Sequence, residues 1–144
     1  MRLSYLIGIF LIVVSCGKVE PREVDTTVSE KKKFEMYQLS EMSLLMEQMY
    51  VDNQRLRNRI ADGEEIGEFP THFLEIHKAA LTDETENDDF FKEQAGLFIK
   101  AQQLIYEDPT NAEKHFNNGI DACIKCHEAK CGGPIPRIKK LYIQ

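Results

Sequence analysis

The chain has 144 residues, of which 18 are Lys or Arg, 24 are Asp or Glu, and 42% are hydrophobic. This length and composition predict one globular domain with a short additional segment, and they argue against a multi-domain architecture. The net charge of -6 argues against nucleic acid as a partner, because binding to phosphates requires an excess of positive charge.

The first residues differ in composition from the rest of the chain. A positive start at Arg2 is followed by the apolar run 3–14, which is shorter than the roughly 20 residues that a membrane-spanning helix needs. The run therefore predicts a secretory signal peptide. It leads into Val14-Ser15-Cys16-Gly17, which resembles a bacterial lipobox. The resemblance implies removal of residues 1–15 and lipidation of Cys16; the alternative is an ordinary secretory peptide with a chance cysteine.

We therefore expect an exported protein, anchored by lipid to the periplasmic side of a bacterial membrane. The sequence does not distinguish the inner from the outer membrane. Residues 16–29 lack apolar periodicity and carry mixed charge, which predicts a flexible tether, and residues 30–144 form the predicted domain.

Within this domain, apolar residues recur every three or four positions in segments that end at turn-forming residues. The predicted helices are 30–62, 70–81, 89–107 and a fourth that opens at Asp108-Pro109 and ends before Gly132. The second helix is expected to bury Phe73, Leu74, His77 and Leu81. The segment 141–143 is too short to count as a strand, so the fold class is all-α. Four helices with short connections predict an antiparallel four-helix bundle.

The motif Cys123-Ile124-Lys125-Cys126-His127 indicates a specific chemistry, because C-x-x-C-H is the attachment motif for a c-type haem. At 100° per residue, Cys123, Cys126 and His127 fall within an arc of about 100° on one face of the fourth helix. The thiols would form thioethers with the two vinyl groups, and the imidazole would be the proximal iron ligand. The motif therefore predicts one covalent haem c on the last helix.

Two readings without haem are also open. Cys123, Cys126, His127 and Cys131 could form a Cys3His zinc set, although structural zinc sites usually draw their ligands from separate chain segments. A redox dithiol of the thioredoxin type would require a βαβ setting, for which the sequence gives no strands.

A four-helix bundle with C-x-x-C-H near the end of its last helix resembles the class II c-type cytochromes, which include cytochrome c prime. LSEMSLLMEQM (39–49) is similar to the first helix of that family, and FKEQAGLFIKAQQLI (91–105) to its third. The resemblance implies one haem. It also implies a homodimer as one of the oligomeric states that the chain could adopt. The turn after the motif, Glu128-Ala129-Lys130-Cys131, departs from the basic residue that the family usually carries there.

The sixth coordination position separates two functions of such a protein. The resemblance implies that a first-helix methionine fills it in electron carriers, and by its place in the pattern Met42 is the predicted ligand. Met46 is second, and Leu39 is the blocking residue if there is no ligand. A filled site suits electron transfer, whereas an open site would bind NO or CO. Methionines at this spacing are also common core residues.

Several further residues have weaker interpretations. His72 and His77 could supply a bis-His site, whereas His115 lies too far along the fourth helix to bind the same iron. Cys131 is either a packing residue or available for an intermolecular disulfide. The acidic segment 82–89 is either a solvated connection or a docking face for a partner. Three basic residues after the fourth helix are either partners of the haem carboxylates or surface residues: Arg137, Lys139 and Lys140.

The sequence thus predicts a membrane-tethered monohaem c-type cytochrome that carries single electrons between periplasmic or membrane redox partner proteins. It shows no acid–base constellation, so we expect no enzymatic activity. An open-site NO or CO binder is the alternative, and a structural zinc protein is the third hypothesis.

Overall fold

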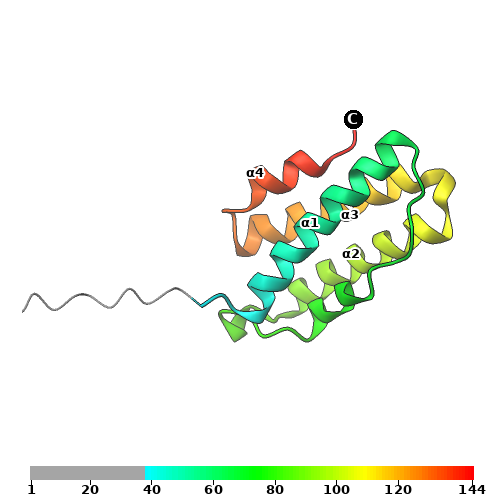
Figure 1. Cartoon of the computed structure of the whole chain (residues 1–144). Coiled ribbons are helices and arrows are strands. Elements are labelled where there is room, and N and C mark those ends of the chain that lie inside the picture. The colour runs from blue at the N-terminus through cyan, green and yellow to red at the C-terminus, as the bar shows by residue number, and fades with distance from the viewer. Residues whose placement is uncertain (1–37) are drawn as a thin grey trace, which may run out of the picture. The chain divides into compact units, whose positions relative to one another are not determined.

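The computed structural model describes residues 38–144 (Figure 1). The predicted signal peptide 1–15, the lipidation site Cys16 and the tether 16–29 lie outside the described residues. The described part is helical and contains no strand, which confirms the all-α fold class. Its α-helices are α1 (Glu41–Asp62), α2 (Asp89–Glu107), α3 (Ala112–Lys130) and the short α4 (Ile135–Ile138). Four 3-10 segments accompany them: Thr71–His77, Glu84–Glu86, Pro109–Asn111 and Lys139–Leu141.

The first helix begins later than predicted. Residues 38–40 are not helical, and α1 starts after Ser40, whose hydroxyl accepts a hydrogen bond from the Ser43 amide at 3.2 Å. A serine that satisfies a free amide of the first turn is a preferred N-cap, so the expected helix over 30–62 is wrong at its start. The helix ends as expected at Gly63, whose φ of 67° is the left-handed conformation that glycine adopts without strain.

The predicted second helix is also wrong. In place of an α-helix over 70–81, the chain forms the 3-10 segment Thr71–His77. This segment buries Phe73 and Ile76, three positions apart, as the period of a 3-10 helix requires. Leu74 and His77, which an α-helical period would have buried, are exposed. The connection from α1 to α2 therefore contains no α-helix.

The predictions for the other two helices agree with the structure except at the start of the last one, where a 3-10 turn over Pro109–Asn111 precedes α3. α2 has the predicted bounds and begins after Asp88, whose carboxylate accepts a hydrogen bond from the Phe91 amide at 2.9 Å. α3 follows the 3-10 turn Pro109–Asn111 and ends before Gly132. The two helices form a hairpin in which Gly119 allows close contact, since a Cβ there would lie 3.4 Å from Gln102 Nε2.

The core has two apolar clusters along the helices. The first surrounds Phe73 and Phe98 and includes Met42, and the second surrounds Ile105, Phe116 and Ile120. Along both α1 and α2, a buried polar residue separates the residues of the first cluster from those of the second. These two polar residues pair, because Gln102 Nε2 donates to Asn53 Oδ1 at 2.7 Å. Asn53 Nδ2 in turn donates to the Met49 carbonyl at 2.8 Å.

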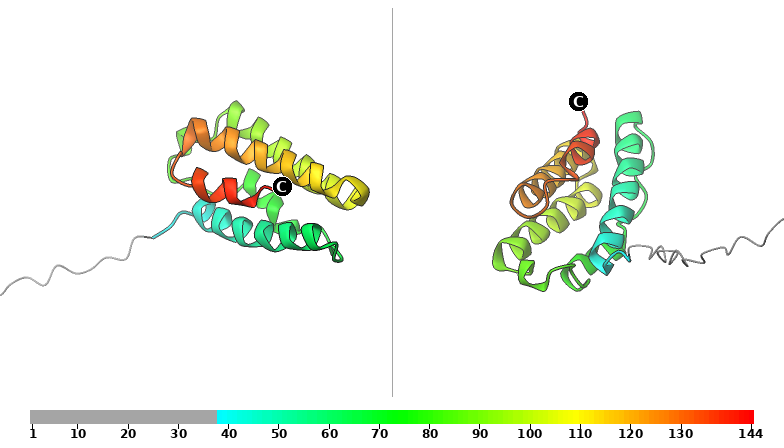
Figure 2. Two further views of the ribbon diagram at one scale, coloured as in Figure 1. Left: turned by 90° about the horizontal axis from the view of Figure 1, so that it is seen from above. Right: turned by 90° about the vertical axis from the view of Figure 1, so that its left-hand side faces the viewer.

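No helix was predicted after α3, but the chain there forms α4 and a 3-10 turn. It turns back and lies between α1 and α3 (Figure 2). Ile138, Leu141 and Ile143 are buried in the second cluster, and the backbone of Ile143 makes two hydrogen bonds with the Asn117 side chain, each 3.0 Å long. No helix within residues 38–144 is long and apolar enough to cross a bilayer.

The buried Asn53–Gln102 pair generates a stability prediction. In Asn53→Leu the Gln102 amide loses its hydrogen-bond acceptor, and leaving such a group unpaired should lower the free energy of unfolding by about 1–3 kcal/mol. Urea unfolding of the full chain measures the loss. The control is Gln54→Leu, an exposed position on the same helix, which should change stability by less than about 0.5 kcal/mol. Equal effects of the two substitutions would contradict the prediction.

Candidate functional site

The residues of the C-x-x-C-H motif lie in the last two turns of α3. Cys123, Cys126 and His127 are each partly buried, and neither thiol is in a disulfide. Cys123 packs against both core clusters, and Cys126 packs against the first. The structure thus brings both thiols and the imidazole to the core side of α3.

The end of α3 fixes the orientation of His127. Its Nδ1 lies 3.0 Å from the Cys131 carbonyl oxygen, and the Cys131 amide donates to the His127 carbonyl at 3.0 Å. A carbonyl oxygen only accepts hydrogen bonds, so Nδ1 carries a proton, and in the neutral imidazole the lone pair is on Nε2. Histidine ligands of metals commonly donate their second ring nitrogen to a backbone carbonyl in this way. Nε2 is therefore the nitrogen of His127 that could bind a metal.

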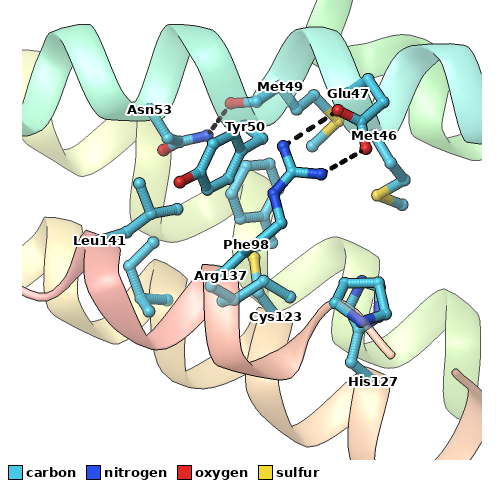
Figure 3. Close-up of a pocket in the computed structure, with 13 residues that line it drawn as sticks. Met46, Glu47, Met49, Tyr50, Asn53, Phe98, Cys123, His127, Arg137 and Leu141 are labelled. Carbon is cyan, nitrogen blue, oxygen red and sulfur yellow. Dashed lines mark hydrogen bonds and ion pairs between the residues drawn. The ribbon is translucent and has the colours of Figure 1, made fainter. Parts of the chain in front are cut away.

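Two cavities that share lining residues lie at the motif, and Figure 3 shows the larger one. They have volumes of about 80 Å³ and about 30 Å³. Both are lined by Met46, Met49, Phe98, Cys123 and His127. Ligand pockets usually have about 300–1,000 Å³, so a macrocycle would have to move the walls. The methionines can do so because their side chains are unbranched and adaptable, and one wall of the larger cavity is the short C-terminal segment.

The methionines of α1 differ in their relation to these cavities. Met42 is buried in the first cluster and lines neither cavity, although it is the predicted sixth ligand. Met46 and Met49 line both, and Met46 is the more exposed of the two. Leu39, the alternative blocking residue, lies before α1 and is 46% exposed.

The other histidines lie away from the cavities. His72 Nε2 is 3.0 Å from an Asp52 carboxylate oxygen, and His115 Nε2 is 3.1 Å from Asp108. His77 is exposed, and neither cavity is lined by any of the three. The arrangement gives the bis-His alternative no support.

The zinc alternative receives no support from the arrangement either. Within residues 38–144, no three His, Cys, Asp or Glu side chains gather as ligands for one metal ion. Of the alternative Cys3His set, Cys131 is exposed, while Cys123 packs into the core.

Ion pairs are present at both ends of this site. Lys130, in the last turn of α3, pairs with Glu86 at 2.7 Å and with Asp88, so part of the acidic segment 82–89 is engaged within the domain. The Lys130 hydrogen bond lowers the pKa of the Asp88 carboxyl. At the larger cavity, Arg137 makes two hydrogen bonds with Glu47, at 2.8 and 3.0 Å, and its guanidinium lies 4.2 Å from the centroid of the Tyr50 ring.

Sequence reasoning missed one polar residue of the site. Gln94 falls on the apolar seam of α2, is 1% exposed and lines the smaller cavity beside Cys126. Within residues 38–144, neither its amide nitrogen nor its amide oxygen has a hydrogen-bond partner. A glutamine at a core position of the predicted helix is the signal that could have found it.

The donor set fits a c-type haem. Two unpaired thiols and an imidazole with a free Nε2 share one helix face, and a buried amide without a partner lies in the same cavity. No protein-family model, curated protein or solved structure matches this chain.

The buried thiols generate a pH prediction for the chain without attached haem. Burial raises the pKa of the Cys123 thiol from 9.0 to about 12 and also raises the pKa of Cys126. Above pH 9 the unfolded chain therefore releases a proton that the folded chain retains. The free energy of unfolding should fall as pH rises from about 9 toward 12, by up to about 1.4 kcal/mol per pH unit for one thiol.

The measurement is urea unfolding at pH 8 and at pH 10 under reducing conditions. Cys123→Ala should lose less stability over this interval than the parent chain, whereas Cys131→Ala, which removes an exposed thiol, should lose as much as the parent. The same loss in Cys123→Ala as in the parent would rule out a buried neutral thiol at position 123.

Proposed function

We propose that this chain is a monohaem c-type cytochrome, tethered to a membrane, that carries single electrons between periplasmic or membrane redox partners. The observation that carries the proposal is the arrangement at the end of α3. Cys123 and Cys126 lie beside His127, and the Cys131 carbonyl leaves the His127 Nε2 free. The tether through Cys16 and the export of the chain rest on the sequence alone.

We further propose that the domain is a variant of the antiparallel four-helix bundle of class II c-type cytochromes. Contacts along α1 and α2 support a common direction for these helices, because Met42 lies by Ala80 just before α2 and Asn53 lies by Gln102 near its end. The connection 63–88 and α3 run the opposite way. In this variant the 3-10 segment Thr71–His77 takes the place of the second helix.

Each residue of the site would have a separate task. A bound haem supplies a reversible change of one electron between ferric and ferrous iron. The sulfur atoms of Cys123 and Cys126 would hold it covalently, and Nε2 of His127 would bind the iron. The Cys131 carbonyl orients the imidazole ring and raises its basicity. Phe98, 2% exposed, helps to exclude water from this part of the core.

For the sixth position we propose Met46 in place of Met42. Met42 packs in the core away from both cavities, whereas Met46 lines both and is only partly buried. A thioether ligand keeps the iron six-coordinate in both oxidation states, which favours electron transfer over ligand binding. We propose no catalytic residues and therefore no enzymatic activity.

A second candidate function is the binding of NO or CO at an open sixth position. The buried Gln94 amide favours it, because an amide with no partner can donate a hydrogen bond to a small polar ligand. Structural zinc has no comparable observation in its favour.

The test is an optical spectrum of the protein matured in cells able to attach c-type haem, recorded oxidised and reduced, before and after addition of CO. We expect a covalent haem signal that does not change with CO. A signal that shifts with CO would favour the second candidate. Absence of a haem signal would refute both functions.

Matched cysteine substitutions extend this test. Cys123→Ala together with Cys126→Ala should abolish covalent haem and lower the thermal stability of the protein, because the cofactor would form part of its core. Cys131→Ala removes a thiol of the same segment that is exposed, and it should retain the full haem content. Loss of haem in this control would contradict the assigned roles.

The choice of axial ligand can be tested separately. Met46→Ala should open the sixth position, so that the reduced protein binds CO, with a modest loss of stability. Met42→Ala should leave the spectrum insensitive to CO and cost about 2–5 kcal/mol as a substitution in the buried core. Sensitivity to CO in Met42→Ala alone would instead restore Met42 as the ligand.

A further inference from the structure

Two glutamines of α2 are fully buried, and they differ in their partners. Gln102 is 0% exposed; its Nε2 donates to Asn53 Oδ1 at 2.7 Å, while its Oε1 has no partner within residues 38–144. Gln94, about two turns earlier, is 1% exposed and has no partner for its amide nitrogen or its amide oxygen within residues 38–144. Gln102 therefore has an evident role in joining α1 to α2, whereas Gln94 has none within the described chain.

The position of Gln94 is costly unless something in the cavity pairs with it. A buried donor or acceptor without a partner costs about 1–3 kcal/mol, whereas a leucine at such a position carries no such penalty. Gln94 lines the smaller cavity together with Cys123, Cys126 and His127. Its partner is therefore to be sought in whatever occupies that cavity.

Water is a partner for Gln94 only as long as the cavity holds no haem. A buried water needs about two to four polar groups, and the lining residues other than Gln94 present hydrocarbon, sulfur and one imidazole. The Nδ1 of that imidazole already donates to the Cys131 carbonyl, so its Nε2 is the one strong acceptor that a water could share with Gln94. A haem iron bound to Nε2 would take this acceptor from the water.

A c-type haem carries polar atoms in two places that the chain can reach. A haem bound through Cys123, Cys126 and His127 would present its carboxylates and a further ligand on its iron. Arg137 lines only the larger cavity, whereas Gln94 and Cys126 line only the smaller one. Arg137 is paired with Glu47, and as an arginine at the larger cavity it is the residue that could exchange this carboxylate for those of the haem, which leaves the iron ligand for Gln94.

We propose that Gln94 is a positioning residue for the sixth ligand of the haem iron, to which its Nε2 donates a hydrogen bond. This inference rests on the proposed haem function. The acceptor would be the further iron ligand, which has two sources: the sulfur of Met46 or a small external ligand such as water, NO or CO. Hydrogen bonds from the surrounding protein to metal ligands are one of the means by which a protein tunes its iron.

The test compares Gln94→Leu with Gln102→Leu in the haem-loaded full chain. If Met46 is the acceptor, Gln94→Leu should lower the reduction potential, because loss of the hydrogen bond leaves the sulfur a stronger donor to ferric iron. If an external ligand is the acceptor, the stretching band of bound CO should move to higher frequency. Gln102→Leu should leave both readouts at their parent values, because Gln102 lines neither cavity.

Unfolding of the chain without attached haem provides a readout independent of the cofactor. There, Gln102→Leu should lower the urea midpoint because Asn53 loses its donor, while Gln94→Leu should leave it unchanged or raise it. If Gln94→Leu yields too little protein, Gln94→Asn keeps the amide but shortens its reach, and it should give the same shifts.

The outcomes separate the two proposals. A parent protein without haem refutes the proposed function itself. A parent with haem, in which Gln94→Leu changes neither the potential nor the CO band, overturns only the role of Gln94. If Gln94→Leu lowers the stability of the chain without haem as much as Gln102→Leu does, Gln94 is a packing residue.

Discussion

The termination of α3 at Lys130 is the constraint on which the site depends. Because the helix stops there, the Cys131 carbonyl is free to accept the Nδ1 hydrogen of His127, which fixes the tautomer of the imidazole. The stop also lets the following residues turn back between α1 and α3 and form one wall of the larger cavity. Lys130 secures this end of the helix by pairing with Glu86 and Asp88 next to the start of α2. One helix end therefore orients a ligand, completes a cavity and joins two helices.

The sequence was informative where a local signal and a long apolar period agreed. The bounds of α2 follow from Asp88 as a cap and from an apolar seam that continues to Ile105. The common face of Cys123, Cys126 and His127 follows from helical geometry alone. The chemistry of the motif could therefore be inferred before any packing was known.

Elsewhere the signals were short or depended on distant residues. Ser40 sets the start of α1 by accepting a hydrogen bond from the Ser43 amide. Extending the apolar period of α1 toward the N-terminus does not take this cap into account. The segment 70–81 is consistent with both helix types, and burial of Phe73 with Ile76 decides between them. The C-terminal segment is ordered by Asn117 and by apolar contacts that local sequence does not reveal. The contrast between Gln94 and Gln102 likewise depends on which residues of α1 and α3 face them.

The pair between Glu47 and Arg137 has a consequence for the choice of solution conditions. Both side chains are about half exposed, at 56% and 48%, so dissolved salt screens their attraction, whereas the apolar burial of Ile138 and Leu141 does not weaken with screening. Raising the ionic strength should therefore weaken the attraction between the guanidinium and the carboxylate while leaving the C-terminal segment attached. The wall that this segment contributes to the larger cavity is thus held mainly by apolar burial, which does not depend on the salt concentration.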